Sequence, residues 1–251
     1  MTSYITPGLD SPAAVDATHQ PAPRRLVTDA PTRMFHWLFA LSFLGAYLTA
    51  EGEHFRLVHV TLGYTMAGLL AFRVLYGLFG PKHAGLGALW RKLAGAPAWL
   101  RELVQARSPG QVNWRQAQNM LMALAVVALL VMVVPLTLTG YGSYNDRAGE
   151  WLQDLHELAG NALLFIVLAH IGLVMVLSVV RRKNQALPML TGRVEGTGPS
   201  LVKNNRVWLA ALLLVAVLGY VTWEWQQSPN GLITAQSFSK AGHGGRHPDS
   251  D

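Results

Sequence analysis

The stretch LHELAGNALLFIVLAH, residues 155–170, carries two histidines, His156 and His170, in a run that is otherwise mostly apolar. In an α-helix each residue turns by 100° and rises by 1.5 Å, so a spacing of 14 returns to within about 40° of the same face and advances ~21 Å. The two imidazoles therefore share one helix face at two depths. Ionisable side chains inside a membrane are costly and usually functional. The stretch predicts a membrane-crossing helix with two functional histidines.

The composition of the whole chain agrees with a membrane protein. Of 251 residues, 51% are apolar and 14% are charged, against roughly 25% charged in an average soluble domain. There is no cysteine, which excludes disulfides, zinc–thiolate sites, iron–sulfur ligation and thioether-attached haem. The net charge of +6 does not indicate nucleic-acid binding, because the basic residues alternate with long apolar runs.

Five apolar stretches approach the ~20 residues that cross a hydrocarbon core. They cover residues 34–50, 57–79, 117–139, 155–180 and 207–223. The first is preceded by Asp29 and Pro31, which are typical of a helix start. We therefore expect an all-α integral membrane protein with a four-helix transmembrane bundle and a fifth, C-terminal transmembrane helix.

The distribution of the 20 Lys and Arg residues predicts the orientation. Fifteen of them fall before the first stretch, between the second and third, or between the fourth and fifth, and these regions lie on one side of the membrane. By the positive-inside rule that side is the cytoplasm. We expect a bacterial inner-membrane protein with a cytoplasmic N-terminus and a periplasmic C-terminus. Lipid headgroups are an additional partner for the same basic surface.

Two further histidines complete the pattern. Counting along the helices places His59 level with His156 near the outer surface, and His36 level with His170 about 21 Å deeper. Two imidazoles at each of two levels are what two non-covalent, bis-histidine b-type haems require. The alternatives are a polar residue with a satisfied hydrogen bond at each position, or a proton or ion relay in a transporter.

Three more residues are candidates for cofactor binding. Gly63 and Gly160 each lie four residues after a histidine and hence one turn away on its face, where they leave room for a flat group; close helix packing is the competing explanation. Arg73 lies at the inner level and is a candidate partner for haem propionates. Its alternative is to extend towards the cytoplasmic headgroups. The loop histidines His54 and His83 are expected to be solvated.

Four segments of the chain resemble the bacterial cytochrome b561 and hydrogenase-type cytochrome b families. They are PTRMFHW at 31–37, RLVHVTLGYTMAGLLAFRVLYGLFGPKHA at 56–84, LHELAGNALLFIVLAH at 155–170 and RRKNQALPMLTGR at 181–193. The resemblance covers about residues 25–195 and implies that His36, His59, His156 and His170 are the axial ligands. The fifth helix and the C-terminal segment fall outside the shared core.

The resemblance implies a function in electron transfer. Its members move electrons between the quinone pool and a partner at the membrane surface, here a periplasmic cytochrome c or a dehydrogenase or hydrogenase subunit. An electron-transfer subunit is favoured over a stand-alone enzyme. Two alternatives stay open: a superoxide-oxidising quinone reductase, and a haem-free membrane anchor or transporter.

The expected organisation has four parts. Residues 1–28 form a flexible cytoplasmic tail, 29–195 the di-haem bundle, 196–224 the fifth helix, and 225–251 a periplasmic tail. The last of these contains His243 and His247, for which solvation is favoured over metal binding.

Overall fold

The computed structural model describes residues 23–145 and 149–228. Five long helices dominate it: α1 (Ala30–Leu48), α2 (Arg56–Phe79), α5 (Trp114–Tyr144), α6 (Glu150–Val180) and α8 (Val207–Gln227). Each coincides with one of the five apolar stretches. The expected C-terminal segments beyond residue 228, with His243 and His247, lie outside the described residues, as do residues 1–22.

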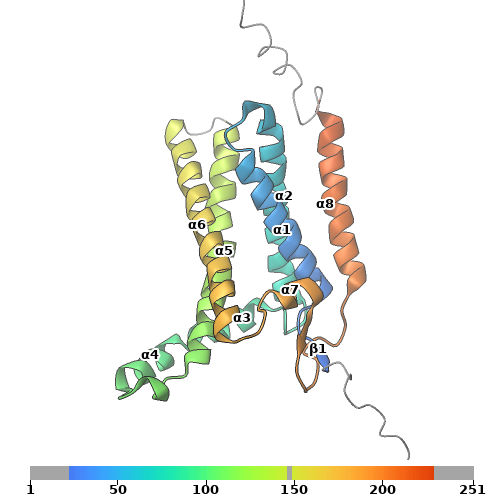
Figure 1. Ribbon diagram of the computed structural model, residues 1–251. Helices are drawn as coiled ribbons and strands as arrows, with labels where there is room; N and C mark the ends of the chain where they lie inside the picture. Colours follow the sequence, from blue (N-terminus) through green and yellow to red (C-terminus); the bar gives the residue numbers. More distant parts are fainter. Residues whose placement is uncertain (1–22, 146–148, 229–251) are drawn as a thin grey trace, which may run out of the picture.

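The long helices stand side by side with their axes roughly upright in Figure 1. Helix α5 packs along α6, α1 packs along α2, and α2 joins the two pairs by contacts with α5. Helix α8 lies at the edge of the group against α1 and α2. The four helices α1, α2, α5 and α6 therefore form the bundle, and α8 is an addition to its side.

Two small apolar clusters hold the helices together. Phe43, Met66, Val133 and Leu163 bring together one residue each from α1, α2, α5 and α6. At the other level, Phe35 of α1 and Leu69 of α2 meet Leu213 of α8. The second cluster is the contact by which α8 is attached.

Much of the apolar surface faces outward. Phe165 and Val179 of α6 are 73% and 77% exposed, and Leu48 at the end of α1 is 73% exposed. Large apolar side chains in contact with water would be unfavourable over a surface of this extent. Their exposure fits a multi-pass membrane protein, in which lipid covers them.

Four helical segments among the described residues are long and apolar enough to cross a membrane. They are Glu53–Phe79, Trp114–Tyr144, Glu150–Val180 and Val207–Gln227. Helix α1 has 19 residues but is not one of the four, since Arg33 and His36 make it more polar. Four candidate spans are thus established by length and composition, and a fifth stays a prediction.

Short elements close the end of the bundle at which the basic residues gather. Helices α3 (Leu86–Ala94) and α4 (Ala96–Gln105) with the 3-10 turn η3 (Pro109–Gln111) connect α2 to α5. Helix α7 (Leu187–Thr191) follows α6, and β1 (Arg24–Leu26) pairs antiparallel with β2 (Arg193–Glu195). At the opposite end, the 3-10 turn η2 (Glu53–Phe55) precedes α2. The labels β1, α3, α4 and α7 lie together at the lower end in Figure 1.

The strand β1 corrects one expectation. The tail was expected to stay flexible to residue 28, but main-chain pairing places Arg24 opposite Glu195 and Leu26 opposite Arg193. Apolar periodicity cannot reveal so short a strand, because the partner strand is distant in sequence. Helix α8 likewise continues to Gln227, three residues past the expected end of the fifth helix.

Candidate functional site

The outer pair of histidines meets between α2 and α6. The ring centres of His59 and His156 are 5.9 Å apart, and the ring planes are inclined by 82°. Bonds from a metal to imidazole nitrogen are about 2 Å long in zinc sites, so two imidazoles on opposite sides of one metal have centres roughly 6 Å apart. The separation of these two rings therefore fits the two sides of a single metal ion.

The second nitrogen of each outer imidazole is held by the main chain. His59 Nδ1 lies 2.8 Å from the carbonyl oxygen of Ala46 on α1, and His156 Nδ1 lies 3.0 Å from that of Leu136 on α5. A carbonyl oxygen only accepts, so each Nδ1 carries the proton and donates. The lone pair is thereby left on Nε2, the tautomer that a metal ligand needs. Thr139 Oγ1, at 3.3 Å from the same nitrogen of His156, is a second contact.

A cavity of about 970 Å³ surrounds the outer pair. Both histidines line it, together with Gly63 and Gly160. A Cβ atom built on Gly63 would meet nothing within 4 Å, and one on Gly160 would meet only Leu136 Cδ1 at 3.8 Å. Close helix packing is therefore not what these two glycines serve. They widen a space of the size that ligand cavities have.

Gly140 is a site residue that the sequence reasoning missed. It lies on α5, lines the same cavity, and a Cβ atom there would be 2.8 Å from Cε1 of His156. Any larger residue would press on the imidazole. Nothing in the sequence singles out this glycine, because its role depends on how α5 meets α6.

The inner pair consists of His36 on α1 and His170 on α6, and both side chains are half-buried. The two residues interact electrostatically. Among the described residues, Nδ1 of each is buried without a hydrogen-bond partner, and so is Oγ1 of Thr32, one turn before His36. Buried polar atoms without partners are rare and need an explanation. A bound polar or metal-containing group between α1 and α6 would supply one.

Arg73 is buried, with 8% of its surface exposed. Its Nη1 donates to the carbonyl oxygen of Ala84 at 2.9 Å, and it interacts electrostatically with Asp29 and Tyr76. Extension towards the headgroups is therefore wrong as an account of this side chain, because the loop after α2 folds back over it. A contact with propionates stays a prediction.

A buried carboxylate next to Arg73 was not foreseen as a site. Asp29 is 0% exposed; its Oδ1 accepts from the N–H of Thr32 as the N-cap of α1, and its Oδ2 accepts from the hydroxyl of Tyr76. His83 Nε2 lies 3.0 Å from the same Oδ2. Burial raises the pKa of Asp29, but these three hydrogen bonds outweigh it and hold the pKa below its usual range. The expected solvation of His83 is thus wrong, since the loop turns it inward.

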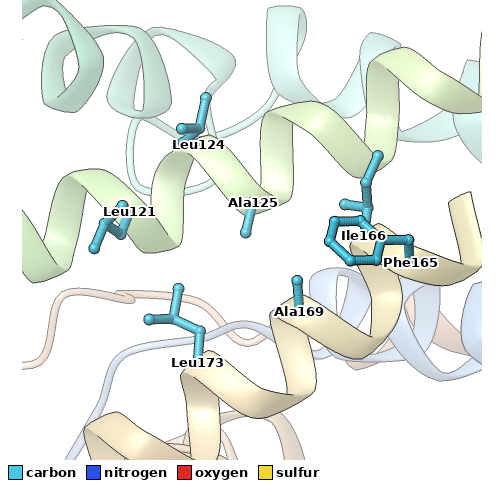
Figure 2. Close-up of a pocket in the computed structure, with 7 residues that line it drawn as sticks. All are labelled: Leu121, Leu124, Ala125, Phe165, Ile166, Ala169 and Leu173. Atoms are coloured by element: carbon cyan, nitrogen blue, oxygen red, sulfur yellow. The ribbon is translucent and has the colours of Figure 1, made fainter. Parts of the chain in front are cut away.

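A second cavity, of about 300 Å³, lies between α5 and α6. Figure 2 shows leucines of α5 and the side chains of Phe165, Ala169 and Leu173 of α6 around it. Ala169 precedes His170, but the lining offers no polar side chain to orient a substrate. Its lining is wholly apolar.

Protein side chains alone do not build a complete metal site here. Within residues 23–145 and 149–228, no group of three or more histidines, aspartates or glutamates could hold a metal ion. Pairs of histidines suit a metal whose other ligands come from a macrocycle.

Comparison with known families gives one result. The model of a family described as prokaryotic cytochrome b561 matches residues 27–192. No curated protein and no solved structure gives a match. The matched segment begins just after β1 and ends just before β2, and it contains α1 to α7.

Proposed function

The chain belongs to the prokaryotic cytochrome b561 family, and from this premise we propose that it carries electrons across the bacterial inner membrane between quinone and a periplasmic redox partner. Membership makes it a membrane b-type cytochrome of electron transfer. The proposal adds two haems, their ligands, the quinone and the partner.

The haem sites follow from the two histidine pairs. His59 and His156 would hold the outer haem, and His36 and His170 the inner one. The observation that carries the proposal is the outer pair, with ring centres 5.9 Å apart and both Nδ1 atoms fixed by main-chain carbonyls. A haem with two histidine ligands supplies a reversible one-electron carrier and has no free coordination position, which favours transfer of electrons without bond formation at iron.

The charge around the outer cavity favours a protein partner over superoxide. Among the described residues, four glutamates and one arginine, Arg56, line the cavity; the guanidinium carbon of Arg56 lies 5.6 Å from the centre of the Tyr144 ring. The glutamates are Glu51, Glu53, Glu150 and Glu157. A negative rim repels an anion such as superoxide and attracts the positive face of a redox protein. We therefore favour a partner such as a basic cytochrome c.

Difference spectra of the purified protein test the haem assignment. Reduced-minus-oxidised spectra should show b-type bands with two haems per chain in the wild type. His156→Ala should remove the outer haem and His170→Ala the inner one, so each variant should retain about half of the haem. His54→Ala, in the turn before α2, is the control and should retain both. A protein without b-type bands would overturn the proposal and leave the haem-free anchor or transporter.

The partner is tested by the salt dependence of electron transfer. Reduction or oxidation of the haems by a basic cytochrome c should slow as ionic strength rises, because screening weakens attraction between exposed charges. Quinone reduction driven by superoxide at a rate that exceeds the cytochrome reaction would instead support the superoxide-oxidising enzyme.

A further inference from the structure

The end of the bundle that carries most of the basic residues holds a buried cluster of proton-exchanging groups. Asp29 precedes α1, Tyr76 lies in the last turn of α2, and His83 lies in the loop that follows α2. The hydroxyl of Tyr76 and Nε2 of His83 both contact Oδ2 of Asp29. The side chain of His83 is 18% exposed, whereas Asp29 is fully buried. The cluster thus extends from the surface of the protein at His83 to the interior of the helix bundle at Asp29.

Two arginines, one of them in a strained backbone conformation, lie beside the cluster. Arg73, one turn before Tyr76, anchors the loop of His83 through Ala84. Arg206 interacts with Tyr76 from the start of α8 and has a φ of 46°, a left-handed conformation that is costly for a non-glycine residue and is frequent at functional sites. Asp29 therefore interacts with Tyr76, His83 and Arg73, and Arg206 interacts with Tyr76.

Capping alone does not explain a carboxylate at position 29. Serine, threonine and asparagine cap helices as well as aspartate, and none of them brings a charge into a buried position, where an ion costs several kcal/mol in desolvation. The negative charge has a use when it stabilises a protonated imidazole and lies between two groups that exchange protons.

We propose that His83, Asp29 and Tyr76 form a proton relay between the cytoplasm and the ring of a quinone bound at this end of the bundle. This inference rests on the proposed function. Leu75, 55% exposed, and Phe79, 83% exposed, form an apolar face of α2 at the level of Tyr76, which is itself only 7% exposed. A quinone from the bilayer would bind against this face and reach the buried hydroxyl between the two side chains. The axial distance from His36 to Asp29 is seven residues, about 10 Å.

Reduction of the quinone needs two electrons and two protons. The redox partner supplies two electrons by the proposed route, and each carbonyl oxygen of the quinone gains one proton and becomes a hydroxyl. For each proton, the imidazolium of His83 first transfers its proton to Oδ2 of the Asp29 carboxylate. The hydroxyl of Tyr76 then transfers its hydrogen to the quinone oxygen and takes this proton from Asp29, and His83 is reprotonated from water. Hydroquinone oxidation is the reverse sequence.

Rapid mixing of the oxidised, haem-loaded protein with a short-chain hydroquinone tests the relay. Asp29→Asn keeps an oxygen to cap α1 but does not carry protons, and it should slow haem reduction by hydroquinone at least ~10-fold. Reduction by dithionite, which releases no proton to the relay, should stay at the wild-type rate and extent. His83→Ala should be slowed in the same way, and added imidazole should restore its rate.

A matched control separates capping from proton transfer. Asn113 caps α5 through Oδ1 to the N–H of Gln116, and Asn113→Ser changes a cap at the same end without touching the cluster; its hydroquinone rate should equal that of the wild type. Wild-type rates in Asp29→Asn, or slow dithionite reduction and lost haem in that variant, would overturn the relay. Failure of the wild type to accept electrons from hydroquinone would instead overturn the quinone part of the proposed function.

Discussion

Gly140 allows α5 to lie directly against the imidazole of His156. The position lacks a side chain, and the space that a Cβ atom would need is filled by Cε1 of the ring at 2.8 Å and Nδ1 at 3.0 Å. The close approach fixes the position of the His156 imidazole relative to α5. The glycine keeps the ring close enough for Nδ1 to reach the carbonyl oxygen of Leu136.

Gly140→Ala should therefore displace the ring of His156 and weaken the outer haem site. Overpacking of this kind costs about 1–3 kcal/mol, and we expect partial loss of the outer haem with the inner haem retained. Haem content and difference spectra measure it. Gly219→Ala, where a Cβ meets nothing within 4 Å, is the control; equal haem content in both variants would contradict the role of Gly140.

Asp29 makes the stability of the bundle depend on acid. The pKa of folded Asp29 lies below the ordinary value of 3.8, so its contribution to stability is present above that unfolded value and disappears as the pH falls through the folded pKa. In detergent, the melting temperature should drop below about pH 4, and it should drop less in Asp29→Asn. An identical acid profile in the two proteins would show that the carboxylate does not act in this way.

The sequence was enough to predict which histidines pair with each other, but it did not predict the residues that surround them. Regular helix geometry is enough to place His59 near His156, and their rings do meet. The carbonyl oxygens of Ala46 and Leu136, the approach of Gly140 and the inward turn of His83 depend on contacts between distant segments. No periodicity in the chain encodes them, so Asp29 was foreseen only as a helix cap. The ligand roles themselves stay predictions.

At the scale of elements, α8 supports α1. Leu213 packs against Phe35 and Leu69, and the side chain and main chain of Asn205 both accept from the N–H of Ala30. These contacts hold the start of α1, which carries Asp29 and His36. We infer that the helix outside the family segment stabilises the inner site.

Leu213→Ala should lower the melting temperature in detergent and loosen the inner site. Leucine truncations in packed cores cost 2–5 kcal/mol, and we expect about 2 kcal/mol because the contact lies at the edge of the bundle. Leu212→Ala is the matched control, since Leu212, the neighbour of Leu213 on α8, is 56% exposed. A similar loss of stability in both variants would contradict a specific contact at position 213.

Sequence patterns located the long helices better than the short elements. All five apolar stretches became helices, although α5 begins before and ends beyond the expected 117–139. Its ends, with Arg115 and Tyr141, are too polar to stand out by hydropathy. Helices α3 and α4 and the pair β1–β2 were not foreseen, because short elements are stabilised by tertiary contacts more than by intrinsic propensity.

The course of α1 through the whole molecule supports the prediction that it is a fifth membrane-crossing helix. Helix α1 begins beside Asn205 at the basic end, and Ala46, near its other end, reaches His59 at the outer level. It therefore runs the length of the bundle despite its polar residues. Along this course it packs against α2 and α8.

Reporter fusions at both chain ends should reveal opposite sides. We expect a fluorescent reporter to be active at the N-terminus and alkaline phosphatase to be active after Asp251, as an odd number of crossings requires. A fusion after Ser108, between α4 and α5, serves as the cytoplasmic control. Phosphatase activity at both termini would show four crossings and place α1 outside the set.

The pairing of β1 with β2 sets a constraint on biogenesis. Leu26 lies opposite Arg193, so the N-terminal strand is synthesised early and its partner emerges only after α6 is complete. The strand therefore stays without its partner while α1, α2, α5 and α6 are synthesised. We expect β1 and β2 to pair once residues 27–192 have been synthesised, before α8 has emerged from the ribosome.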